Sequence, residues 1–178
     1  MRASRAQEAA SQAYAGRGLL SGSRTDQRPA QVTTMVLTSP FARSPEEVFR
    51  FSLARDTFPA LMPDPVTVLW TSTQDGELGG TYDFRWRFKR VVPIRWTAFI
   101  DSWDEGREFS DRQVRGMFRW FHHTHTCDPD PAGCRYTDTV TFRSLLGPRL
   151  DRAVLLPQME SLFRTRHDRM RRMLDAMP

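Results

Sequence analysis

The chain has 178 residues, of which 39% are hydrophobic and 26% are charged, so one globular domain is the expected organisation. No apolar run approaches the roughly 18 residues of a membrane span, and two cysteines exclude a disulfide scaffold or an all-cysteine zinc site. The net charge is +5, but it is concentrated in the first 34 residues, and the remaining chain is nearly balanced. We therefore expect no nucleic-acid partner and no stable membrane insertion.

Residues 1–30 consist mainly of Ala, Ser, Gly, Gln and Arg and show no apolar periodicity. This composition predicts a disordered N-terminal tail, followed by one domain over residues 31–178. The tail lacks the continuous apolar segment of a secretory signal, so we expect a cytoplasmic protein. A start at Met35 is an alternative interpretation of the same segment.

The first elements of the domain are a strand over residues 31–38 and a helix that begins near Ser44. Ser44 is a candidate N-cap, with Pro45 at the first helical position and Glu47 at the third, which together predict a capping box. Three prolines interrupt residues 59–65 and limit that stretch to a short helical turn.

Strand patterns then follow at hairpin spacing, separated by turn residues. They cover Val66–Thr71, Thr81–Arg90, Ile94–Asp104, Glu108–Val114, Phe118–Thr126 and Arg135–Arg143. After Gly147 the apolar period becomes helical, and Pro157 must kink this last helix or begin its main segment. Its apolar residues should face the sheet: Leu155, Met159, Leu162, Phe163 and Met170. This order predicts an α+β fold with an antiparallel sheet.

The element order and several motifs resemble the helix-grip fold of the START, birch-pollen-allergen or SRPBCC superfamily. The motifs are SPEEVFRF at 44–51, RWTAFIDSWDEGREFSDRQVRG at 95–116, HTHTC at 123–127, DTVTFRSLLGP at 138–148 and LFRTRH at 162–167. They are similar to a bacterial branch of ligand-binding or cyclase/dehydrase-like proteins, although Cys127 stands where that branch usually carries an aromatic residue. The resemblance implies a curved seven-stranded antiparallel sheet around a long C-terminal helix and a cavity.

The last hairpin can be registered if Cys127 lies opposite Cys134 across the turn DPDPAG. The cysteines are then hairpin partners that we expect to be reduced thiols. This register pairs His125 with Tyr136, His123 with Asp138, and Phe121 with Val140. The face with two histidines and one aspartate is the more apolar one, so we expect it to be concave.

On that face the polar side chains of Asp111, Gln113, His123, His125 and Asp138 should converge beside aromatic strands. An apolar pocket with a few convergent polar groups is typical of a small-molecule site. The candidate ligand-binding residues are Phe84, Trp86, Phe88, Trp96, Phe109, Gln113, Phe121, His123, His125, Tyr136, Asp138 and Phe163. Arg166 falls near the apolar stripe of the last helix, where it can meet a carboxylate.

The His123–Asp138 pair has several interpretations. It is a buried structural hydrogen bond, a ligand contact, or a catalytic pair in which His123 or His125 is the acid–base and Asp138 or Asp111 orients it. His-x-His on a strand, with Asp111 or Asp138 as a third ligand, also suits a metal. We expect no metal and no cofactor, because no further ligand pattern accompanies these residues.

Three functions remain open. The first is non-enzymatic binding of a hydrophobic or amphipathic small molecule between the sheet and the C-terminal helix, with a lipophilic molecule as the partner. The second is a polyketide cyclase- or dehydratase-like enzyme that acts on carbonyl substrates. The third, implied by relatives fused to epimerase-like reductases, is a regulatory domain for a reductase or epimerase-like protein partner.

Overall fold

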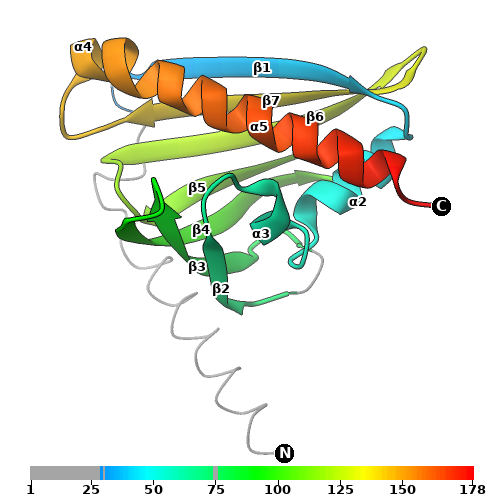
Figure 1. Cartoon of the computed structure of the whole chain (residues 1–178), viewed down its shortest axis with the longest axis horizontal. Coiled ribbons are helices and arrows are strands. Elements are labelled where there is room, and N and C mark those ends of the chain that lie inside the picture. The colour runs from blue at the N-terminus through cyan, green and yellow to red at the C-terminus, as the bar shows by residue number, and fades with distance from the viewer. Residues whose placement is uncertain (1–28, 30, 74–75) are drawn as a thin grey trace, which may run out of the picture. The chain divides into compact units, whose positions relative to one another are not determined.

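The computed structural model describes residues 29, 31–73 and 76–178. In this part of the chain seven antiparallel strands form one curved sheet in the order β1-β7-β6-β5-β4-β3-β2 (Figure 1). The first strand therefore pairs with the last, and all other neighbours are hairpin partners. The strands are β1 (Thr33–Phe41), β2 (Val66–Thr71), β3 (Thr81–Phe88), β4 (Val92–Asp104), β5 (Glu108–Arg115), β6 (Trp120–Asp130) and β7 (Gly133–Arg143).

The helices are α2 (Pro45–Leu53), α3 (Phe58–Leu61), α4 (Pro148–Leu150), the π-helical turn η1 (Asp151–Leu155) and α5 (Leu156–Asp175). The capping box of α2 is confirmed: the Ser44 hydroxyl accepts from the Glu47 backbone N–H, and the Glu47 carboxylate accepts from the Ser44 N–H. Pro157 lies at the start of α5, directly after η1, and so begins the main helical segment. The ring of a proline clashes with the carbonyl four residues earlier in an α-helix, which disfavours an α-helical turn directly before Pro157.

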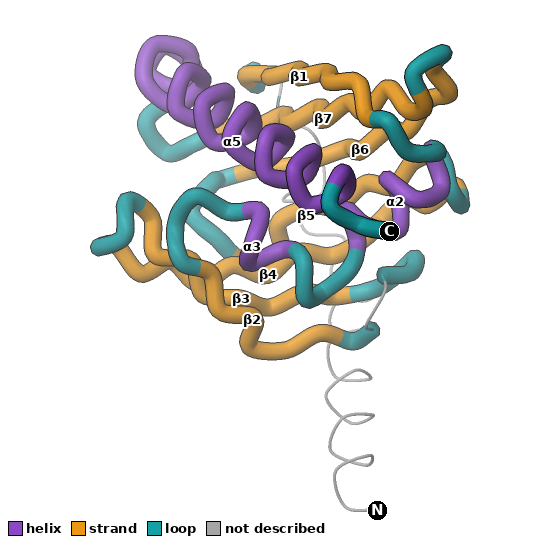
Figure 2. Tube along the Cα trace, turned by 45° about the vertical axis from the view of Figure 1, so that its right-hand side comes forward, coloured by secondary structure: helices purple, strands orange, loops and turns teal. Residues whose placement is uncertain are grey.

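Helix α5 lies across one face of the sheet beside β1, β7 and β6, and its C-terminal end lies near α2 (Figures 1 and 2). Phe163 and Met170 are buried against the sheet, as the helical period predicts. Leu155, Met159 and Leu162 are partly buried and pack on the same core. The seven-stranded helix-grip architecture expected from the sequence is thereby confirmed.

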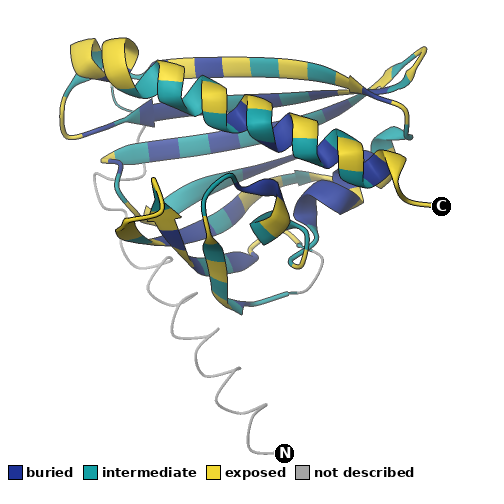
Figure 3. Cartoon of the chain, in the orientation of Figure 1, coloured by how far each residue is buried: buried dark blue, intermediate teal, exposed yellow. Residues whose placement is uncertain are grey.

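Buried side chains form two clusters on this face of the sheet, and Figure 3 shows their strands alternating between buried and more exposed residues. The first cluster packs α2 and the C-terminal half of α5 on the sheet, with Val48, Phe49 and Leu174 at its centre. The second gathers the aromatic residues of β3, β4 and β6 beneath the N-terminal half of α5.

The register of the last hairpin differs from the prediction by two residues. His125 lies opposite Asp138, His123 opposite Val140, and Cys127 opposite Tyr136. The segment DPDPAG is not a six-residue turn, because Pro129 and Asp130 continue β6 as far as a two-residue loop at 131–132. The Asp130 carboxylate accepts from the Ala132 N–H and supports this tight turn.

A shift of two residues keeps every side chain on its predicted face, since the side-chain period of a strand is two. His123, His125 and Asp138 thus share the concave face although the pairing was wrong. Cys127 and Cys134 are free and buried, and they are not direct cross-strand partners.

The expected tail, residues 1–30, lies outside the described residues except for position 29. Within the described ranges, no helix is both long enough and apolar enough to span a membrane.

Candidate functional site

A cavity of about 140 Å³ lies between the concave face of the sheet, α5 and the segment around α3. Its walls are mostly aromatic and aliphatic, with polar side chains contributed by α2, β5, β6 and α5. The apolar lining comprises Leu53, Phe58, Met62, Tyr82, Phe84, Trp86, Trp96, Ala98, Ile100, Phe109, Phe118, Phe121, Met159, Leu162 and Phe163. The remaining lining residues are Ser52, Asp111, His123, His125 and Arg166.

Eight of the twelve ligand-binding candidates from the sequence line this cavity, and four do not. The eight are Phe84, Trp86, Trp96, Phe109, Phe121, His123, His125 and Phe163. Phe88 instead packs edge-on against Trp86, with 5.1 Å between ring centroids. Gln113 closes the β5–β6 turn, because its amide donates to the Phe118 carbonyl and accepts from the Phe118 N–H. Tyr136 and Asp138 are buried behind the two histidines.

Asp138 is the centre of the polar network. Its carboxyl is fully buried, and its Oδ1 lies 2.9 Å from both His123 Nε2 and His125 Nδ1. Its Oδ2 accepts from His167 Nε2 of α5 at 3.0 Å. The predicted His123–Asp138 contact thus exists, as a diagonal pair rather than a direct cross-strand pair. One carboxylate therefore orients three imidazole rings and ties α5 to the sheet.

The charges of this network follow from burial and from its hydrogen bonds. Burial by itself raises the pKa of Asp138, but the charges and hydrogen bonds of His123 and His125 outweigh it and hold that pKa well below its usual range. Burial, together with the neighbouring His125, lowers the pKa of His123 to about 4. Burial also opposes the charge of His125, yet Asp138 and Asp111 raise its pKa. The arrangement favours an ionised Asp138, a neutral His123 and a charged His125.

Tyr136 belongs to the same network. Its hydroxyl lies within hydrogen-bond distance of His125 Nδ1. Burial raises the pKa of Tyr136 well above its usual value, and the negative charge of Asp138 raises it further. The phenol is therefore neutral and serves as a fixed donor or acceptor behind the His125 ring.

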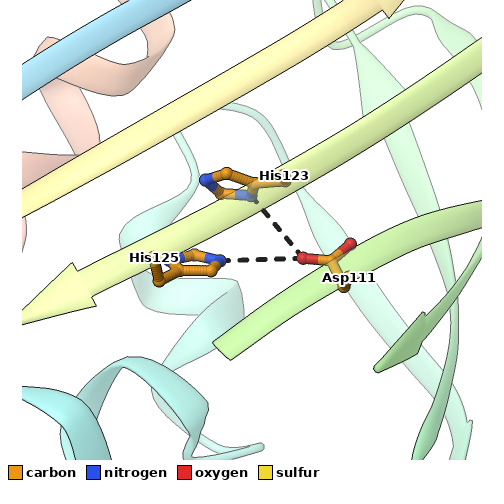
Figure 4. Close-up of side chains that lie close together, drawn as sticks. All are labelled: Asp111, His123 and His125. Atoms are coloured by element: carbon orange, nitrogen blue, oxygen red, sulfur yellow. Dashed lines mark ion pairs between the residues drawn. The ribbon is translucent and has the colours of Figure 1, made fainter. Parts of the chain in front are cut away.

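Asp111 faces the same two rings from the opposite side. It lies directly across from His123 on β5, and its Oδ2 is 3.6 Å from both His123 Nδ1 and His125 Nε2 (Figure 4). These separations exceed the usual 2.7–3.2 Å range of an N–H···O hydrogen bond. Each ring therefore uses one nitrogen on Asp138 and turns the other toward Asp111 and the cavity.

Arg166 is the basic side chain of the cavity lining, and only 7% of the residue is exposed. Its guanidinium carbon lies 4.8 Å from the centroid of the Phe163 ring. Its Nε atom is buried and has no hydrogen-bond partner within residues 31–73 and 76–178. The sequence placed Arg166 near the apolar stripe, but the expected carboxylate partner is not present for this atom among the described residues.

Two kinds of site residue were missed from the sequence. His167 follows Phe163 by four residues and precedes Met170 by three, so the helical period already placed it on the buried face. Phe58 and Met62 come from the proline-interrupted segment after α2, where no periodic pattern marks a side chain as part of a cavity. Phe118 was expected at the start of a strand over residues 118–126, but β6 begins at Trp120, so Phe118 lies before the strand and does not follow its alternation.

A search of curated proteins gives no match. A search of solved structures gives many matches, and the three described below are 10% to 15% identical to this chain, which shows a shared fold. Protein CV1439 from Chromobacterium violaceum has a TM-score of 0.65 at 15% identity, covering 81% of this chain and 99% of its own. The structure of Ara h 8.0201 has a TM-score of 0.62 at 14% identity, covering 83% and 100%.

The di-domain ARO/CYC protein StfQ from the steffimycin biosynthetic pathway has a TM-score of 0.62 at 10% identity. The match covers 81% of this chain and 51% of StfQ. The family model described as polyketide cyclase / dehydrase and lipid transport matches residues 32–177, which include every strand and helix described above. With the helix-grip fold and the cavity beneath α5, this match places the chain in the polyketide cyclase / dehydrase and lipid transport family.

Proposed function

We propose that this protein binds a small amphipathic molecule that has an apolar body about the size of one ring and one acidic group. The observation that carries the proposal is Arg166, which lines the polar end of an otherwise apolar cavity and whose buried Nε has no hydrogen-bond partner among the described residues. The fold and the family support binding of a hydrophobic ligand. The volume of the cavity and its lining residues limit the size and the charge of the ligand.

The size follows from the cavity volume. About 140 Å³ is close to the roughly 150 Å³ of an engineered apolar cavity that holds benzene. Tyr82, Phe84, Trp96 and Phe121 provide flat apolar walls for such a body. A long acyl chain or a multi-ring polyketide would need a larger space than this conformation provides.

The charge follows from Arg166. A buried donor without a partner costs about 1–3 kcal/mol, and the cost is larger for charged groups. A guanidinium is a planar donor that matches a carboxylate, so an acidic ligand removes this cost when it enters. A ligand with the same apolar body and no acidic group gains only the hydrophobic contribution.

A matched pair of probes tests the proposal: phenylacetate and 2-phenylethanol, titrated by calorimetry or by NMR. We expect phenylacetate to bind at least tenfold more tightly, since a charge-assisted hydrogen bond contributes about 1.5–3 kcal/mol. Arg166→Met should remove this preference and retain binding of the alcohol. Arg164→Met is the control, because Arg164 is exposed on the same helix. Equal binding of both probes by the wild type, or binding of neither, contradicts the proposal.

A second candidate function is favoured by the geometry of His123. One nitrogen of its ring is held by Asp138 while the ring lines the cavity, which is how a general base is oriented. A cyclase- or dehydratase-like enzyme would use this pair on a bound carbonyl compound. Turnover of such a compound that is lost in His123→Ala and retained in His122→Ala would favour this candidate.

A reductase or epimerase-like partner and a cytoplasmic location stay predictions from the sequence.

A further inference from the structure

We infer that Asp111, His123 and His125 form a binding site for one divalent transition-metal ion, with Zn²⁺ as its representative, at the polar end of the cavity. The inference departs from the sequence expectation of no metal. It is independent of the proposed acidic ligand, because it rests on the positions of three ligand atoms and on the network behind them.

The three ligand atoms lie at separations that suit one bound ion. Asp111 Oδ2, His123 Nδ1 and His125 Nε2 all lie within 4.8 Å of one another, and both nitrogens are 3.6 Å from the oxygen (Figure 4). Two ligands at about 2.0–2.1 Å from a common zinc ion are separated by roughly 3.3–3.6 Å at tetrahedral to trigonal angles. The 3.6 Å between the Asp111 oxygen and each nitrogen is too long for an ordinary hydrogen bond, and it is the separation expected for two ligands of one ion.

The two rings are also supported from behind. Metal-binding histidines commonly donate their other N–H to a carboxylate, which fixes the tautomer and the ring orientation. Asp138 Oδ1 lies 2.9 Å from the other nitrogen of both rings, and Tyr136 contacts the His125 ring as well. His167 holds the second oxygen of Asp138 and is itself 2.8 Å from Ser39 Oγ. These residues therefore form a network that holds the His123 and His125 rings in place. The spacing of residues in the sequence did not show this network.

The chemistry and the openness of the site also suit a metal ion. Zn²⁺ displaces the proton from His125 Nε2 to solvent, after which two imidazole nitrogens and one carboxylate oxygen are suitable ligands for Zn²⁺ and for Fe²⁺. All three residues line the cavity, so further coordination positions face its interior. Asp111 and Asp138 balance the two positive charges of the ion. Arg166 then adds a positive charge that an anionic ligand in the cavity would balance.

The test begins with the full chain dialysed against a chelator, to which Zn²⁺ is added in a calorimeter and Co²⁺ in an absorption cell. We expect one equivalent of each ion per chain, and Co²⁺ absorption bands typical of four- or five-coordination. His123→Ala should abolish binding. Asp111→Asn should weaken it by about 10-fold or more while the fold is retained, because Asp111 is partly exposed. Asp138→Asn should weaken binding by about 10- to 100-fold although it removes no ligand.

His122→Ala is the matched control. His122 is adjacent to His123 on β6 but points to the other face of the sheet, where it lies 3.4 Å from Asp101. Its removal should leave zinc affinity and stoichiometry unchanged. No binding by the wild type overturns the inference. Binding that survives both Asp111→Asn and His123→Ala also overturns it, since the metal is then an adventitious ion only. Melting curves recorded for each folded variant show which losses arise from unfolding.

Discussion

The two ends of the core beneath α5 are built from similar residues but packed differently. At the α2 end, Val48, Phe49, Leu61 and Leu174 are each at most 2% exposed, and aromatic rings meet edge-to-face. At the other end the aromatic residues of β3, β4 and β6 surround a cavity of about 140 Å³, which Leu53, Ile100 and Phe109 of the first cluster close on one side. Filled packing stabilises a fold, whereas an unfilled apolar space loses dispersion contacts that a ligand can restore. We therefore assign stability mainly to the α2 end, called the packed end below, and ligand binding to the end with the cavity, called the hollow end.

Phe49→Ala should have the largest effect on stability. Phe49 is 1% exposed and packs edge-to-face on both Trp103 and Phe109. Its truncation should cost about 3–5 kcal/mol of unfolding free energy, because the packed surroundings leave a cavity that collapses only partly. Denaturant unfolding measures this loss. Probe affinity of the remaining folded protein should be unchanged, and a parallel loss of affinity would show that the two ends are coupled.

Phe121→Ala is the matched change at the hollow end and should cost less. The Phe121 ring already borders the cavity, so its truncation enlarges an existing space and removes fewer contacts. We expect a loss at the lower end of the range, about 3 kcal/mol. Affinity should shift from phenylacetate toward a larger probe such as 2-naphthylacetate. A loss of stability that equals the Phe49→Ala value, without a change in size preference, would break the comparison.

Ala98→Leu tests the hollow end in the opposite direction. Ala98 lies on β4 and lines the cavity, so three added carbon atoms occupy the space of the ligand. Binding of both phenylacetate and 2-phenylethanol should fall by about tenfold or more, since overpacking and lost volume together cost about 1–3 kcal/mol. Stability should change less than affinity. Ala60→Leu is the control, because Ala60 is exposed on α3, and it should leave both quantities unchanged.

The smallest expected effect is a pH dependence at the start of α2. The backbone N–H of Ser44 holds the pKa of Glu47 below its ordinary value of 4.5. A carboxyl whose folded pKa is lowered stabilises the fold above its unfolded pKa, and this contribution is lost as pH falls below about 4.5. The wild type should therefore melt slightly above Glu47→Gln at pH 7 and lose this advantage at about pH 3. An unchanged difference between the two pH values would contradict the capping role.

Much of the fold was readable from the sequence because local signals agreed with one another. The capping box at Ser44, the regular hairpin spacing and the helical period after Gly147 each specify an element without reference to the rest of the chain. The register of the last hairpin was not readable, because a strand can continue through Pro129 when the following loop has only two residues. The faces were still correct, since the error was an even number of residues.

The candidate site was only partly readable for a different reason. Alternation along β6 placed His123 and His125 on one face, but their separate nitrogens, one on Asp138 and one toward Asp111, are set by ring rotation. The unpartnered Nε of Arg166 depends on what α5 meets across the core. The volume of the cavity is the small difference between the space that the backbone encloses and the volume that the side chains fill. The apolar periodicity of the sequence does not predict this difference.

The measurement that tests the central claim most directly is a set of intermolecular NOEs between phenylacetate and the isotope-labelled protein. The account predicts NOEs from the phenyl ring to Phe84, Trp96 and Phe121, and a shift of the Arg166 Nε–H resonance when the carboxylate enters. NOEs to residues of the packed end, such as Val48 or Leu174, or a saturating complex without any NOE to the cavity walls, would contradict it.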